Sequence, residues 1–155
     1  MIGRVCRVLV GLACAFLAAG ATMVLFVYSP FELLQDAGAK ALEACLLVLA
    51  AATHSAVFAA PFALLAAGVG EWRGVRGVTY YALAAVGIAA LGFLAEYATE
   101  AAGEASIANA YAAAAFLATG LAAGLAYWLV TGRRAAASAA IRADLTPAGR
   151  AAAGV

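Results

Sequence analysis

The sequence predicts an all-α integral membrane protein, a bundle of four transmembrane helices. The chain is 68% hydrophobic and only 11% charged, whereas soluble domains carry about 25% charged residues. Four long stretches are almost free of charge, and each approaches the roughly 20 residues that a helix needs to cross a bilayer. Short charged segments separate these stretches. Such a surface suits contact with lipid and not with water.

The four predicted helices occupy residues 5–28, 41–67, 77–98 and 105–131. The first apolar stretch is about 21 residues long, and a signal-peptide core has roughly 7–15, so we expect an uncleaved helix. It ends at Pro30, because proline cannot continue the hydrogen-bond ladder. The third stretch is uncharged from Gly77 to Ala95. At about 1.5 Å per residue it spans about 28 Å, which places Glu96 at the far interface of the bilayer.

The second predicted helix contains a proline and is followed by a glycine-rich segment. Pro61 leaves the carbonyl of Val57 without its helical partner and should kink the helix. Residues 68–77 read GVGEWRGVRG, with four glycines, one acid and two arginines. This composition predicts a short polar turn.

The last predicted helix ends at Arg133 and Arg134. The remaining residues are rich in alanine and carry several polar groups, so we expect a mobile tail with a short helix around 135–145. The chain is therefore divided into a transmembrane domain at 1–134 and a short cytoplasmic tail at 135–155.

Charge distribution predicts the orientation. The amino terminus, the central turn and the tail carry net charges of +2, +1 and +3, and the other two loops carry −2 and −3. Because Lys and Arg concentrate on the cytoplasmic side of membrane proteins, both termini are expected in the cytoplasm. Five aromatic residues fall at that same interface, where amphipathic rings prefer to lie: Trp72, Tyr80, Tyr81, Tyr127 and Trp128.

His54 is the only histidine and lies near the middle of the second predicted helix. An ionisable residue at that depth is a functional hypothesis. Glu43 precedes it by eleven residues, or three helical turns, and falls on the same face. Together with Glu96, these residues form a candidate polar pathway for protons or cations. The simpler interpretation, which we favour, is a neutral histidine packed against a neighbouring helix, because desolvation disfavours a charged imidazole.

Acidic residues gather on the predicted outer side, at Glu43, Glu96, Glu100 and Glu104. Carboxylates on adjoining helix ends are the ligands that Ca²⁺ and Mg²⁺ prefer, but an ordinary solvated loop is the favoured interpretation. The three cysteines lack the Cys-x-x-Cys spacing of a zinc site. The sequence therefore predicts neither a metal nor a cofactor.

Small residues recur every four positions on several helices. The last predicted helix contains Gly120 and Gly124 in a GxxxG pattern. Such faces let helices approach closely. They serve either packing within the bundle or association with a second copy or another membrane protein, and both alternatives stay open.

The chain contains no nucleophile with its base, no phosphate-binding loop, no dinucleotide fingerprint and no nucleic-acid motif. We therefore expect a non-enzymatic protein without a nucleic-acid partner, an accessory or structural component of the membrane or of a membrane complex. The alternative is a small oligomeric transporter or channel for protons, cations or a small solute, which would use His54 and the outer glutamates.

Two segments carry a resemblance. Residues 61–97, which include GEWRGVRGVTYYALAAVGIAALGFLAEY, and the ending AYWLVTGRRA resemble small four-helix inner-membrane proteins of bacteria whose function is uncharacterised. The resemblance covers roughly half of the chain. It implies a multi-pass protein in the bacterial cytoplasmic (inner) membrane, with the lipid bilayer as its partner, and it implies no activity or site.

Overall fold

The computed structural model describes residues 2–28, 38–101 and 106–144. Within these ranges the structure has helices and no strand. The helices are α1 (Ile2–Val27), α3 (Ala39–Arg73), α4 (Val78–Ala98) and α5 (Ala110–Asp144). Each contains a stretch long and apolar enough to cross a membrane. The prediction of an all-helical bundle with four candidate membrane spans is confirmed.

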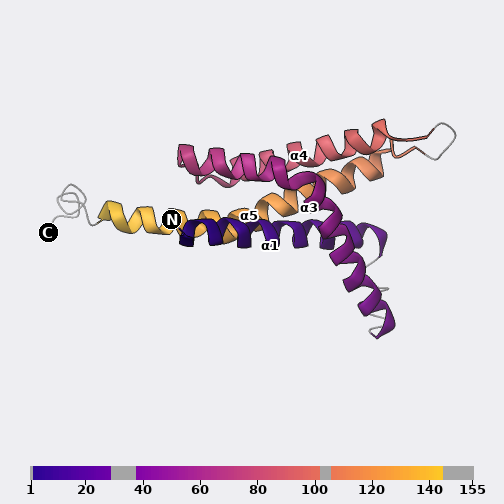
Figure 1. Cartoon of the computed structure of the whole chain (residues 1–155), viewed down its shortest axis with the longest axis horizontal. Helices are drawn as coiled ribbons and strands as arrows, with labels where there is room; N and C mark the ends of the chain where they lie inside the picture. Colours follow the sequence, from indigo (N-terminus) through magenta and orange to yellow (C-terminus); the bar gives the residue numbers. More distant parts are fainter. Residues whose placement is uncertain (1, 29–37, 102–105, 145–155) are drawn as a thin grey trace.

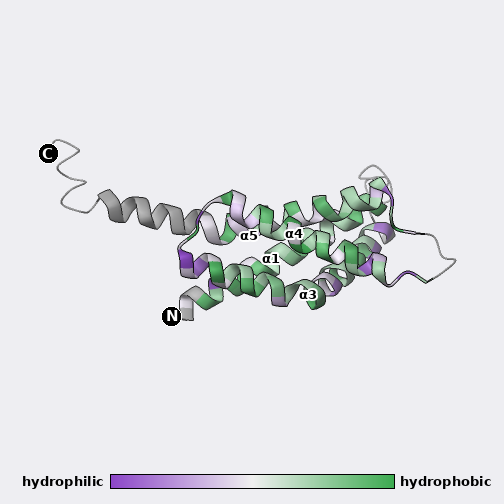
Figure 2. Ribbon diagram, turned by 90° about the horizontal axis from the view of Figure 1, so that it is seen from above, coloured by the Kyte–Doolittle hydropathy of each residue, from purple (hydrophilic) through white to green (hydrophobic). Residues whose placement is uncertain are grey.

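The helices run alternately in opposite directions (Figure 1). α5 packs against both α1 and α4, and α1 also packs against α3. The start of α1, the turn between α3 and α4 and the region of α5 near Gly132 meet at one end of the bundle. Arg7, Arg73 and Arg76 belong to this end, which we call the basic end. Figure 2 shows hydrophobic residues along the helices and hydrophilic residues gathered near the two ends of the bundle.

α3 is longer than predicted. The glycine-rich segment does not form a turn at residue 68, because the helix continues to Arg73. The turn begins at Gly74, which has a left-handed backbone (φ 65°) and donates its N–H to the carbonyl of Gly70. Gly70 serves packing: a Cβ there would lie 2.9 Å from the Tyr81 hydroxyl of α4. Glycine content alone did not distinguish a turn from a close helix contact.

α3 changes direction near its middle (Figure 1), and Pro61 lies inside this helix. The bend agrees with the loss of the hydrogen bond to the Val57 carbonyl. Its first half crosses α1, where a Cβ on Gly20 would lie 2.4 Å from the Val48 carbonyl oxygen. Its second half contacts α4, where the Tyr80 hydroxyl donates to the carbonyl of Ala66 over 2.9 Å.

α5 differs from the prediction at both ends. It begins at Ala110 and not at 105, because the Asn109 side chain accepts a hydrogen bond from the Ala112 N–H over 2.8 Å and so caps the helix. It then continues without a break to Asp144, where we expected an end at 131 and a separate short helix. Alanine is the strongest helix former, and the arginine pair does not interrupt a helix. The predicted mobility of residues 145–155 lies outside the described residues.

The buried core consists mainly of small and aromatic residues. A central cluster contains Leu12, Ala15, Ala67, Tyr81 and Tyr127. Two of the five aromatic residues predicted at the membrane interface are buried in this core, since Tyr81 and Tyr127 are 7% and 5% exposed. Their ring centroids lie 5.1 Å apart inside the bundle. Trp72 is 86% exposed and remains available to a membrane interface.

Candidate functional site

His54 and Glu96 meet between α3 and α4. His54 Nε2 lies 3.4 Å from Glu96 Oε1. Their side chains are 78% and 53% exposed, so the pair lies at the protein surface. The structure thus brings together two of the three residues of the predicted polar pathway.

The contact places the His54 imidazole beside the end of a helix. Glu96 lies two residues before the end of α4, and His54 Nε2 reaches it from α3. The depth of His54 in the bilayer stays a prediction.

The third pathway residue has a different partner. Glu43 Oε1 accepts a hydrogen bond from the Tyr28 hydroxyl over 3.1 Å. Glu43 precedes His54 by three turns of α3, which is about 16 Å along a straight helix. It therefore joins the end of α1 to the start of α3 and is not part of the His54–Glu96 pair.

The predicted acidic cluster is likewise divided between separate contacts. Glu100 Oε1 accepts a hydrogen bond from the Ile107 N–H and closes the loop before α5. Glu104 lies outside the described residues. Among the residues that the structure describes, no group of three or more His, Cys, Asp or Glu side chains is arranged to hold a metal ion.

A cavity of about 270 Å³ lies among the four helices. His54 and Glu96 line one end, and Tyr81 and Tyr127 line the other. Between these ends the walls are almost wholly apolar, with alanines from α3 and α4. The larger apolar residues of the walls are Leu12, Phe16, Met23, Phe58, Ile88 and Phe116. The cavity is thus an apolar space with a polar pair at one end.

Two residues that line this cavity carry buried hydroxyl groups. Thr119 and Tyr127 are 8% and 5% exposed. Neither Thr119 Oγ1 nor the Tyr127 hydroxyl has a hydrogen-bond partner in the described part of the chain. Buried polar atoms are normally paired, and leaving one unpaired is destabilising. Thr119 is therefore a candidate contact for a bound molecule, whereas Tyr127 interacts electrostatically with Glu71 and Arg7 at the basic end.

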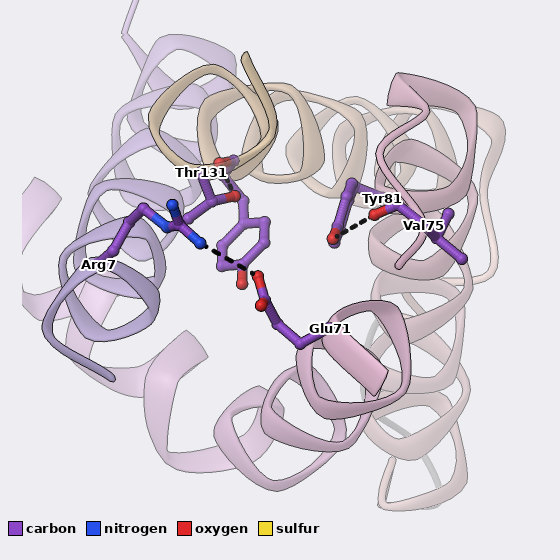
Figure 3. A network of polar contacts seen from close by, with 6 residues as sticks. Arg7, Glu71, Val75, Tyr81 and Thr131 are labelled. Atoms are coloured by element: carbon purple, nitrogen blue, oxygen red, sulfur yellow. Dashed lines mark hydrogen bonds and ion pairs between the residues drawn. The ribbon is translucent and has the colours of Figure 1, made fainter. Parts of the chain in front are cut away.

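The basic end holds a network of polar contacts that the sequence analysis did not predict (Figure 3). The Arg7 guanidinium lies 3.6 Å from the Glu71 carboxylate, and the Tyr81 hydroxyl donates to the Val75 carbonyl over 3.1 Å. The Trp128 indole N–H donates to the Arg76 carbonyl over 3.1 Å. Arg7 and Glu71 carry opposite charges and lie at helix ends that the predicted orientation puts on the same side of the membrane. Their ion pair could have been predicted from this pattern.

The GxxxG face of α5 packs against α4 within the same chain. A Cβ on Gly120 would lie 2.7 Å from the Ala85 carbonyl oxygen, and one on Gly124 would lie 2.6 Å from the Tyr81 carbonyl oxygen. Real Cβ atoms essentially never approach so closely. This face is therefore occupied by an intramolecular contact.

No protein-family model, curated protein or solved structure matches this chain. Two features of the geometry bear on function. One is the tightly joined basic end, and the other is the apolar cavity with the His54–Glu96 pair at its mouth.

Proposed function

We propose that the protein is a non-enzymatic component of the bacterial cytoplasmic membrane, an accessory or structural subunit that acts through its helix bundle. The supporting observation is the use of polar groups at the basic end. Arg7, Tyr81 and Trp128 each join one helix to another helix or to the turn between α3 and α4. These contacts hold helices in place, and the glycine contacts of α5 do the same deeper in the bundle.

The proposed orientation has both termini in the cytoplasm. Arg7, Arg73 and Arg76 lie at one end of the bundle, whereas Glu96 and Glu100 lie toward the other. This separation supports the orientation because Lys and Arg accumulate on the cytoplasmic side. It agrees with the alternating net charges of the segments in the sequence.

Quantitative purification tests the accessory role. The protein is expressed at its native level, extracted in mild detergent and analysed for mass and bound proteins. We expect a defined complex, either with a second copy or with another membrane protein in fixed stoichiometry. A monodisperse monomer at native expression, whose removal changes the abundance of no other membrane protein, would contradict the proposal.

The second candidate function is a small oligomeric transporter or channel, which the His54–Glu96 contact favours. An imidazole and a carboxylate at 3.4 Å are suited to passing a proton or holding a cation. Purified protein in liposomes should then give a pH-dependent flux that His54→Ala and Glu96→Gln abolish. Tyr28→Phe, which removes the contact to Glu43, is the matched control. Equal flux in liposomes with and without protein would exclude this candidate.

A further inference from the structure

The apolar cavity exists because small residues line it where α3 bends away. Alanines take the wall positions of α3 and α4 facing the space, and they are too small to fill it. They are Ala59, Ala63, Ala66, Ala67, Ala84, Ala85 and Ala89. The space is open to the surroundings along part of its boundary, where the exposed His54–Glu96 pair lies. A molecule dissolved in the bilayer can therefore enter it from the side.

The size and lining of the cavity favour an apolar guest over water. Water in a cavity needs two to four polar partners, and an apolar cavity of about 150 Å³ stays dry and binds benzene. The present cavity has about 270 Å³, which leaves space for a ring and part of an attached chain. Because lipid surrounds a membrane bundle, the available apolar guests are molecules dissolved in the bilayer.

Two phenylalanines indicate that the guest carries a ring near the polar end. A Cβ on Gly92 would lie 3.5 Å from Cε1 of Phe58 and 3.8 Å from Cε1 of Phe116. Gly92 lies one helical turn before Glu96 on the same face of α4. Gly92, Phe58 and Phe116 all line the cavity, so aromatic edges border the part of the cavity beside Gly92, which we call the slot. A guest ring can pack on these edges in an edge-to-face or offset arrangement.

The His54–Glu96 pair indicates which head group such a guest carries. An ionised carboxylate only accepts hydrogen bonds, while an imidazole can donate one. A hydroxyl group satisfies both, because it donates to Glu96 and accepts from His54. An anionic head would be repelled by the carboxylate, and a hydrocarbon would form no hydrogen bond with either group. The pair is therefore suited to a neutral hydroxyl.

Thr119 supplies a further polar contact inside the cavity. It is 92% buried, since it is 8% exposed, and its hydroxyl has no partner in the described part of the chain. Rotation about χ1 exchanges its hydroxyl and methyl groups and allows the hydroxyl to face a guest. A second oxygen on the ring would satisfy it.

We propose that this cavity binds a neutral lipid alcohol with its hydroxyl on an aromatic ring, of the phenol or quinol type. The hydroxyl lies between His54 and Glu96, the ring occupies the slot beside Gly92, and the apolar chain extends toward Tyr81. The site is a binding site and requires no reaction. It goes beyond the accessory role, which does not depend on it.

Binding of nonylphenol and of its methyl ether to the full chain in lipid nanodiscs tests the proposal. The ether has the same ring and chain but cannot donate to Glu96. We expect one nonylphenol per chain by native mass spectrometry and a roughly tenfold weaker affinity for the ether, because hydrogen bonds to charged groups contribute on that scale. Glu96→Gln and His54→Ala should remove most of this preference. Decanoate, an anionic probe, should bind more weakly than either.

A matched glycine pair tests the location. Gly92→Leu places a side chain in the slot and should abolish binding of both probes. Gly87→Leu makes the same change on the same helix, where a Cβ would meet nothing within 4 Å, and should leave binding unchanged. Equal affinity for nonylphenol and its ether, or tightest binding of decanoate, would overturn the head-group assignment. Unchanged binding in a folded Gly92→Leu protein would overturn the site. If Gly92→Leu fails to fold, the Glu96→Gln variant tests the site instead. Loss of the preference for nonylphenol over its ether would support the site, and an unchanged preference would overturn it.

Discussion

The guanidinium of Arg7 lies 3.6 Å from the carboxylate of Glu71, so that an ion pair joins the start of α1 to the end of α3 (Figure 3). The two side chains are 30% and 22% exposed. The pair is therefore partly withdrawn from solvent and is screened less than a surface ion pair. It holds together two helices that also meet further along the bundle, where Gly20 contacts the first half of α3.

This pair should show energetic coupling. Arg7→Gln and Glu71→Gln should each lower stability, and the double variant should lose less than the sum, with a coupling energy on the order of 1 kcal/mol. The measurement is a double-mutant cycle of unfolding in a single detergent. Arg73→Gln, an exposed arginine at the same end, is the control and should be nearly neutral. Strict additivity of the two variants would show that the pair contributes nothing.

The crossing of α1 and α3 should depend on Gly20. A Cβ there would lie 2.4 Å from the Val48 carbonyl oxygen and 2.9 Å from the Ala52 nitrogen, and backbone atoms cannot move aside as a flexible side chain can. Gly20→Ala should therefore destabilise by about 1–3 kcal/mol, as overpacking does. Gly87→Ala, in open space on α4, should be neutral or slightly stabilising because alanine favours helix. Equal thermal shifts for the two variants would argue against a close crossing.

The GxxxG face of α5 should serve the fold of the single chain. The Gly124 position lies against the Tyr81 carbonyl of α4, so Gly124→Val should push the two helices apart. We expect a lower unfolding temperature and an unchanged oligomeric state, measured by light scattering on the folded fraction. A folded protein of unchanged stability whose oligomer dissociates would instead assign this face to association between chains.

The sequence was sufficient for the number and order of the helices, and insufficient for several of their ends and for their contacts. Charge-free stretches of bilayer length specify spans locally, and α4 at Val78–Ala98 nearly coincides with the predicted 77–98. The predicted end of α3 was wrong because the sequence around Gly70 does not distinguish a glycine in a turn from a glycine that packs against Tyr81. The extension of α5 follows from alanine propensity, to which we gave too little weight against the arginine pair.

The candidate site needed the tertiary structure. His54 stands out as the only histidine, and Glu96 as the first charge after a long span. Pro61 predicts a bend in α3, but their contact depends on the direction of that bend and on the length of the helix, which no local pattern specifies. Thr119 carried no signal at all, since a threonine in an apolar helix normally bonds its own backbone, as Thr22, Thr53 and Thr131 do.

Cysteine labelling should establish which side the basic end faces. Cys6, Cys14 and Cys45 are free thiols and are first replaced by alanine. Arg76→Cys then reports on the turn at the basic end, and Ser106→Cys reports on the opposite loop. With both termini in the cytoplasm, a membrane-impermeant maleimide should label residue 106 in intact spheroplasts and residue 76 only after permeabilisation. The reverse pattern would contradict the proposed orientation.

The bend of α3 should depend on Pro61. Pro61→Ala restores the N–H that can donate to the Val57 carbonyl and removes the clash of the proline ring, so the helix should straighten and its first half should move relative to α4. Spin labels replacing Leu46 on α3 and Leu94 on α4, both exposed, report this movement as a shift in their distance distribution. Phe62→Ala, at the adjacent exposed position, keeps the proline and should leave the distribution unchanged. An identical distribution in Pro61→Ala would mean that the crossing at Gly20 holds the bend without help from the proline. In that case nonylphenol should bind Pro61→Ala and the unaltered chain equally. If α3 straightens instead, His54 separates from Glu96 and the binding of nonylphenol should weaken.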